Sequence, residues 1–140
     1  MSPRYLLDTN ILSEPLRPNP SAAVMGRLEE HSGQLATASV VWGELVYGVE
    51  RMPRGKRRSV IEDYLDALRG SDLLVLPYDM VAAEWQGRER ARLASAGTSR
   101  PFVDAQIAAV AWRHRVTLVT RNTGDFAPFA GLRIENWFDG

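Results

Sequence analysis

The sequence contains no cysteine and only two histidines, and these absences exclude several kinds of site. Without cysteine there can be no disulfide framework, thiolate zinc site or iron–sulfur cluster. Two histidines cannot form a three-histidine metal site. No segment approaches the roughly 18 unbroken apolar residues of a membrane span, and the first residues are too few and too soon charged for a signal peptide. We therefore expect a soluble, cytoplasmic protein with no membrane partner.

Charge of one sign is not in excess either. The 17 basic and 17 acidic side chains cancel, which argues against a nucleic-acid coat driven by bulk positive charge but not against a local binding groove. With 140 residues, of which 45% are apolar and 24% charged, the composition is typical of one globular domain. We expect a single domain over residues 1–140.

Short apolar runs alternate with helical segments along the whole chain. Strands are expected at 5–8, 35–38, 73–76, 116–120 and 133–136, and helices at 10–16, 21–30, 40–51, 56–68, 80–96 and 101–115. This alternation implies an α/β layer fold with a parallel sheet covered on both faces. Ligands of such sheets bind at the carboxyl ends of the strands, so the polar residues there are the candidates.

Three acidic residues stand at positions that favour a site. Asp8 directly follows the apolar run 5–7, where it suits either a helix N-cap or a metal ligand. Glu44 falls beside the apolar face of its helix, although taken alone it is explained as a surface residue. Asp104 lies in a helix that is apolar nearly all round. A buried acid needs a compensating cation or metal, while the helix dipole also favours an acid in the first turn.

A fourth acid, Asp125, follows the last long strand in the segment Asn122-Thr123-Gly124-Asp125. This is ordinary turn chemistry, and positive φ at Gly124 would let the turn fold Asp125 back over the sheet end. Four carboxylates at one end of one sheet indicate a single site. Oxygen-only ligands select a hard ion, Mg²⁺ or Mn²⁺. Such ions generate hydroxide and neutralise the leaving oxygen in phosphodiester cleavage.

A basic run lies between two of the expected helices. It is explained either as a solvated loop and helix start or as an RNA-backbone contact near the site, since phosphate contacts position a nucleic acid without specifying its sequence. The run consists of Arg51, Arg54, Lys56, Arg57 and Arg58.

Taken in order and spacing, the acidic motifs resemble those of PIN domains, and more narrowly the VapC toxins of bacterial type II toxin–antitoxin systems, including the FitB-like subgroup. The resemblance covers essentially the whole chain, with the tail 129–137 included. The motifs that carry it are Leu7-Asp8-Thr9-Asn10, Glu44-Leu45 followed by Gly48, Asp104 before an alanine-rich helix, and Val119-Thr120-Arg121-Asn122 ending in Asp125-Phe126.

The resemblance implies a three-layer PIN-like fold, with a central, mostly parallel sheet of about four to five short strands flanked by helices. It implies a Mg²⁺-dependent endoribonuclease toxin, with Mn²⁺ as an alternative ion, that cleaves RNA by a metal-activated water. The implied partners are the RNA substrate, a cognate antitoxin that blocks the site, a second copy of the chain, and operator DNA bound only through the antitoxin.

The resemblance also assigns residues. Asp8, Glu44 and Asp104 match the first three family acids. The fourth family acid stands at either of two positions, and because the first of these is the amide Asn122, the role falls to Asp125. The supporting polar positions are Thr9, Asn10, Thr120 and Asn122.

Two other functions are weighed against the nuclease. A catalytically silent PIN-fold binding module that acts only through partner association is supported by Asn122 alone. A phosphotransferase with Asp8 as nucleophile would need a second acid two residues on, where Asn10 stands, and is discarded.

Overall fold

The computed structural model describes residues 2–139 and contains a five-stranded sheet in the order β3-β2-β1-β4-β5. Every neighbouring pair of strands is parallel, so the sheet is wholly rather than mostly parallel. The strands are β1 (Tyr5–Leu7), β2 (Leu35–Ala38), β3 (Leu74–Leu76), β4 (Thr117–Val119) and β5 (Ile134–Glu135). All five expected strands are confirmed, each to within one residue at either end.

The six expected helical segments are also confirmed, with one change. Segment 10–16 is divided into α1 and the 3₁₀ turn η1, because Pro15 in η1 has no backbone N–H to continue an α-helix. The helices are α1 (Thr9–Leu12), η1 (Glu14–Leu16), α2 (Ala22–Glu30), α3 (Ser39–Glu50), α4 (Lys56–Arg69), α5 (Met80–Ser95), α6 (Phe102–His114), α7 (Thr123–Phe126) and η2 (Trp137–Asp139).

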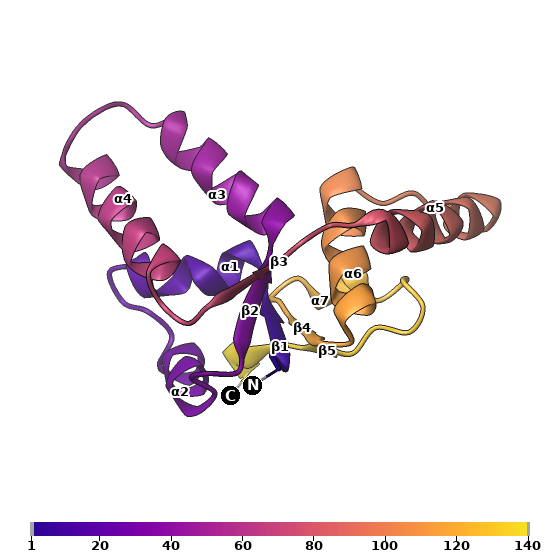
Figure 1. The fold of residues 1–140 in the computed structure, drawn as a ribbon, viewed down its shortest axis with the longest axis horizontal. Helices are drawn as coiled ribbons and strands as arrows, with labels where there is room; N and C mark the ends of the chain where they lie inside the picture. Colours follow the sequence, from indigo (N-terminus) through magenta and orange to yellow (C-terminus); the bar gives the residue numbers. More distant parts are fainter. Residues whose placement is uncertain (1, 140) are drawn as a thin grey trace.

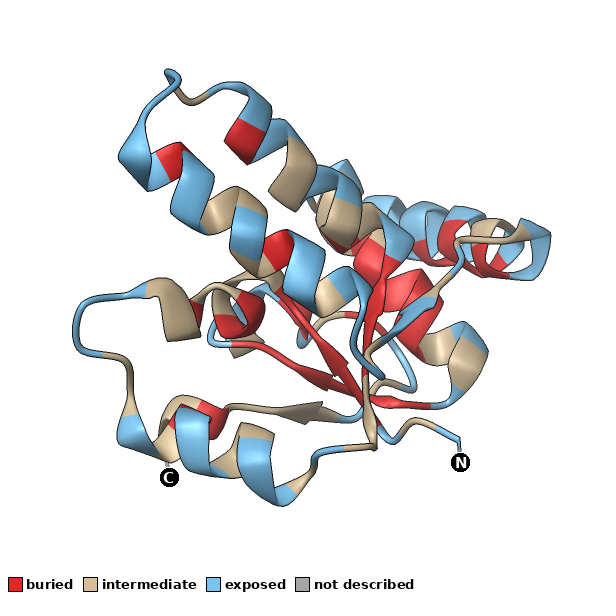
Figure 2. Cartoon of the chain, turned by 60° about the vertical axis from the view of Figure 1, so that its left-hand side comes forward, coloured by how far each residue is buried: buried red, intermediate tan, exposed pale blue. Residues whose placement is uncertain are grey.

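The elements form three layers (Figure 1). Helices α1, α2 and α4 lie to one side of the sheet and α5 and α6 to the other, while α3 projects outward from the end of β2. Figure 2 shows that buried residues are concentrated in the central strands. The alanines of α6 are buried, which lets this helix approach the sheet closely. From Ala105 onward, α6 is thereby packed against the core.

The sheet is covered less completely than expected at its β3 edge. Leu74 and Val75 are 44% and 46% exposed, although their sequence reads as a buried strand. β3 is an edge strand, so it has a neighbouring strand on one side only. Among residues 2–139, no helix combines the length and hydrophobicity that a bilayer-crossing segment requires.

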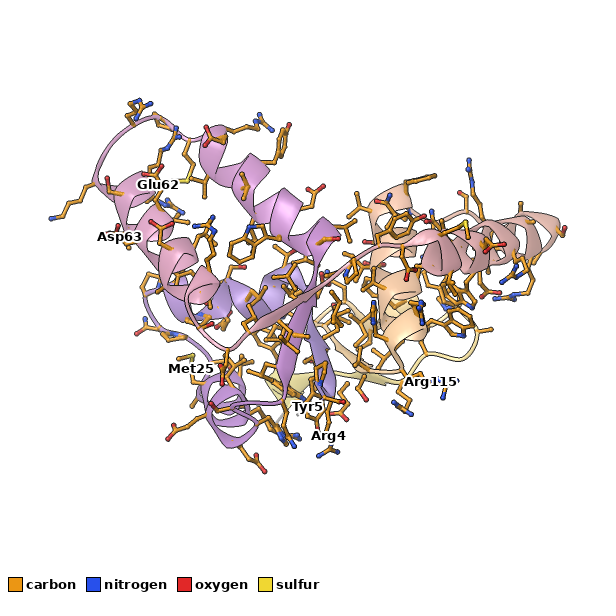
Figure 3. All side chains as sticks on the ribbon, viewed as in Figure 1. Arg4, Tyr5, Met25, Glu62, Asp63 and Arg115 are labelled. Atoms are coloured by element: carbon orange, nitrogen blue, oxygen red, sulfur yellow. The ribbon has the colours of Figure 1, made fainter. Side chains whose placement is uncertain are left out.

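The two ends of the sheet differ in character. Figure 3 shows Arg4, Tyr5 and Arg115 together at one end, where β1 and β4 begin. The candidate acids lie at the other end, where these strands finish. Because β1 and β4 are adjacent and in register from Tyr5 opposite Thr117 to Leu7 opposite Val119, the residues that follow them are neighbours.

Candidate active site

Asp8 is the best-fixed residue of the candidate site. It is 6% exposed and immediately follows β1. Its Oδ1 accepts a 2.8 Å hydrogen bond from the backbone N–H of Thr9, and its Oδ2 accepts one of 2.8 Å from the hydroxyl of Thr120. The first bond makes Asp8 the N-cap of α1. Capping and metal ligation are therefore not alternatives here, because the cap also orients the carboxylate.

A polar frame joins the ends of β1 and β4 around this carboxylate. The side-chain amide of Asn10 donates to Asp8 Oδ2 and to Thr120 Oγ1, both at 3.4 Å, and its carbonyl oxygen accepts from Arg121 N–H at 3.0 Å. The backbone N–H of Asn122 donates to Thr120 Oγ1 at 3.1 Å. Asn10 and Thr120 thus contact Asp8 through their side chains and Thr9 through its backbone N–H, whereas Asn122 reaches only Thr120, also through its backbone.

Three carboxylates from separate elements share one electrostatic environment. Burial raises the pKa of Asp8, repulsion by Asp125 raises it further, and the hydrogen bonds from Thr120, Thr9 and Asn10 lower it. Burial also raises the pKa of half-buried Asp104, as does repulsion by Asp8 and Asp125. The end of β1, the first turn of α6 and α7 therefore bring these acids together.

Asp125, rather than Asn122, contributes charge to this cluster. Asn122 is exposed and its side chain makes no capping bond to α7. The backbone conformation that brings Asp125 to the site differs from the expected one. Gly124 does not have positive φ and lies inside α7. The turn expectation was wrong there: residues 123–126 form a helical turn that buried Phe126 anchors in the core.

Glu44 is less closely tied to the other three acids. It is exposed on α3, and its charge is not among those that shift the pKa of Asp8 or Asp104. It lies on the helix that starts where β2 ends, at the same edge of the sheet. The space around Gly48, one turn further on, is open. The role of Glu44 as a ligand stays a prediction.

The donor set fits a divalent cation, although the side chains do not converge on one point. In the part of the chain that the structure describes, no three acidic or histidine side chains lie close enough to hold an ion as one set. The mutual repulsion of Asp8, Asp104 and Asp125 is the kind that a bound cation relieves, and oxygen-only donors suit hard ions. Exposed Asp125 and Glu44 can change rotamer rapidly.

The five residues of the basic run differ in burial. Arg58 departs from the expectation of a solvated or RNA-contacting side chain. Arg58 is 8% exposed, and its guanidinium donates to Glu50, Glu62 and the carbonyl of Met52. These contacts hold the α3–α4 hairpin together, so Arg58 is structural rather than an RNA contact. Burial of its guanidinium follows from the packing of two helices, which the sequence alone does not show.

The rest of the run is exposed but lies away from the acids. Arg51 stacks on Tyr47, with the guanidinium carbon 5.5 Å from the ring centre. Arg54, Lys56 and Arg57 are exposed. Figure 1 places their loop at the outer end of α3, the end that does not adjoin the sheet. The loop therefore lies away from the sheet edge that carries Asp8, and RNA contact by these four residues stays a prediction.

Sequence reasoning missed Arg100. It lies four residues before Asp104 and is the basic residue whose charge lowers the pKa of that carboxyl, against the raising effects of burial and the other acids. No local pattern indicated it, because Arg100 precedes the N-cap Pro101 and the i, i+4 rule applies only to residues within a helix.

An all-parallel α/β sheet with clustered carboxylates at its carboxyl edge defines a class of proteins suited to chemistry with a hard divalent metal. The family model of the PIN domain matches residues 5–132. The chain therefore belongs to the PIN-domain family.

Known proteins of similar sequence agree with this assignment. The chain is 36% identical over 135 residues to the tRNA(fMet)-specific endonuclease VapC of Shigella flexneri, covering 96% of this chain and 98% of that protein. It is 32% identical over 141 residues to the toxin FitB of Neisseria gonorrhoeae, covering 96% and 99%. The crystal structure of DNA-bound VapBC from Salmonella typhimurium superposes with a TM-score of 0.79 at 32% identity, covering 96% and 98%.

Proposed function

We propose that this protein is a single-domain, cytoplasmic endoribonuclease toxin of a type II toxin–antitoxin module, and that its reaction depends on Mg²⁺, with Mn²⁺ as a substitute. The observation that carries the proposal is the placement of Asp8 after β1, Asp104 in the first turn of α6 and Asp125 in α7, near enough for repulsion to raise the pKa of Asp8 and Asp104. Relatives named as a VapC endonuclease and a FitB toxin, similar over nearly their whole length, support the activity.

Each residue has a distinct part in this proposal. Asp8, Asp104, Asp125 and Glu44 would hold the ion, which supplies an activated water and neutralises the leaving oxygen of the RNA phosphodiester. Thr120 and the N–H of Thr9 fix both oxygens of Asp8, so this carboxylate needs no reorganisation when the ion binds. Exposed Asp125 and Glu44 adjust to the substrate.

The proposed partners follow from the same cluster. An antitoxin can block the acids by inserting an arginine, whose guanidinium pairs with carboxylates in place of the ion. The match to a DNA-bound VapBC structure supports binding to operator DNA as a complex with the antitoxin. A homodimer is proposed on the family resemblance.

The test is cleavage of total bacterial RNA by antitoxin-free protein, with and without Mg²⁺. We expect cleavage only with the ion, and expect Asp8→Ala and Asp104→Ala to abolish it. Asp63→Ala is the matched control, because Asp63 is an exposed acid on α4, distant from the sheet edge (Figure 3). If both site variants cleave like Asp63→Ala, the metal site is misplaced. If the wild type binds its antitoxin but never cleaves RNA, the silent binding module is the correct function.

A further inference from the structure

A cavity of about 330 Å³ lies beside the candidate active site, between α5 and the start of α6. This volume is within the range of small-ligand pockets. Ala105 lines it, so the pocket and Asp104 share the first turn of α6. The lining residues that matter to its chemistry are Gln86, Arg90, Arg100, Phe102, Ala105 and Phe129.

The chain builds this pocket through the way α5 ends. The N–H of Thr98 donates to the carbonyl of Leu93 at 2.8 Å, and the N–H of Gly97 to that of Ala94 at 3.0 Å. Together they form a Schellman motif, which requires the positive φ of 78° that Gly97 adopts. The chain then turns back, and Arg100 lies between the end of α5 and Pro101, the N-cap of α6.

One wall of the pocket is an exposed aromatic ring. Phe102 is 53% exposed, and the guanidinium carbon of Arg90 lies 5.3 Å from the centre of its ring. An aromatic ring flanked by arginine is the platform on which proteins stack the unpaired bases of single-stranded nucleic acid. Buried Phe129 and Leu93 add an apolar floor.

The pocket is also positively charged. Among the described residues that line it, Arg90 and Arg100 are basic and none carries a carboxylate. The Nε of Arg100 is buried and, among residues 2–139, has no hydrogen-bond partner. A buried donor without an acceptor is costly, and such groups in native proteins call for an explanation. The Nε itself is closed to solvent, so a ligand in the pocket would be held by the other N–H groups of the guanidinium, for which phosphate is a well-matched acceptor.

We propose that this pocket is a nucleotide subsite that holds one unpaired RNA nucleotide beside the bond to be cleaved, with the base on Phe102 and its phosphate on Arg90 and Arg100. The inference rests on the proposed nuclease function and deepens it, because it specifies single-stranded RNA at the cleavage site. It also moves the RNA path to the α5–α6 side of the acids and away from the α3–α4 loop.

The test measures binding of a labelled single-stranded RNA of about twelve nucleotides by fluorescence anisotropy, with a chelator present so that no cleavage occurs. We expect Phe102→Leu to weaken binding about tenfold, because it keeps apolar volume but removes the stacking surface. Phe102→Tyr should bind like the wild type. The matched control is Tyr47→Leu, since Tyr47 is 58% exposed beside the basic loop.

A second pair of variants tests the phosphate contact. Arg100→Gln should reduce the slope of log affinity against log salt by about 0.7, the value for one phosphate on a single strand. Arg88→Gln removes an exposed arginine from α5 outside the pocket lining and should leave the slope nearly unchanged. Fully paired RNA of the same length should bind less well than the single strand.

The outcomes separate this inference from the proposed function. If the wild type cleaves RNA with Mg²⁺ but Phe102→Leu and Arg100→Gln bind as the wild type does, the subsite is refuted and the nuclease stands. Weaker binding by Tyr47→Leu with no effect of Phe102→Leu would place the RNA on the α3–α4 hairpin instead. If RNA binds and both pocket variants weaken it while no condition gives cleavage, the subsite stands and the nuclease fails.

Discussion

Replacing Arg58 by methionine should destabilise the fold while leaving RNA binding intact. The buried guanidinium donates to Glu50 Oε2 at 3.1 Å, to Glu62 Oε2 at 3.3 Å and to the Met52 carbonyl at 3.0 Å. It therefore joins the end of α3, the loop and the first turns of α4. Methionine keeps most of the aliphatic volume but removes all three bonds.

The size of the effect can be worked from these contacts. The carboxylates of Glu50 and Glu62 are 66% and 44% exposed, so each ion pair contributes about 0.5 kcal/mol at most after screening by water. The bond to the Met52 carbonyl is charge-assisted and half-buried, and contributes about 1–1.5 kcal/mol. The sum is about 2 kcal/mol, which for a domain of this size lowers the melting temperature by roughly 6–8 °C.

Calorimetry of Arg58→Met against Arg57→Met checks this expectation, since Arg57 is the exposed neighbour. The control should melt within about 1–2 °C of the wild type, in keeping with a surface substitution. The reasoning is refuted if Arg58→Met melts like the control and instead weakens RNA binding, because Arg58 would then be a phosphate contact.

Three further predictions concern the carboxylates. Asp104→Asn should melt at or above the metal-free wild type, because it removes repulsion from the other acids of the site; a large drop in melting temperature would instead make Asp104 a structural cap. Asp125→Asn should lower single-turnover RNA cleavage far more than Asn122→Ala, because only Asp125 brings charge to offset the ion, and the reverse order of activities would exchange their roles. The hydrogen bond from Arg92 lowers the pKa of Glu89, so the stability that this carboxylate contributes is present above its ordinary pKa and is lost as the pH falls through the lowered value. Glu89→Gln should therefore reduce the melting temperature at pH 7, by an amount that shrinks as the pH falls below the ordinary pKa of glutamate, and an effect that stays the same throughout an acid titration would contradict the linkage.

The layer architecture follows from the sequence alone, because the signals that define it are local. The apolar runs of strand length and the helix-forming segments between them are read from neighbouring residues. Capping is equally local: at the start of α2, the hydroxyl oxygen of Ser21 accepts a bond from Val24 N–H. The alternation of strand and helix then requires parallel pairing, and parallel pairing puts the residues after each strand at one edge. Asp8 and Asp125 were found in this way.

Burial, exposure and the pocket depend on contacts between segments that are distant in the sequence, so only the tertiary structure shows them. From the sequence, the five basic residues of one short segment all look equally exposed. Packing of α4 against α3 buries Arg58 and leaves Arg54 exposed. The apolar run of β3 reads as buried, but its place at the sheet edge leaves Leu74 and Val75 exposed. The pocket at Arg100 exists only because Gly97 turns the chain between two packed helices. Burial and electrostatic coupling are properties of residues distant in sequence, so no local pattern specifies them.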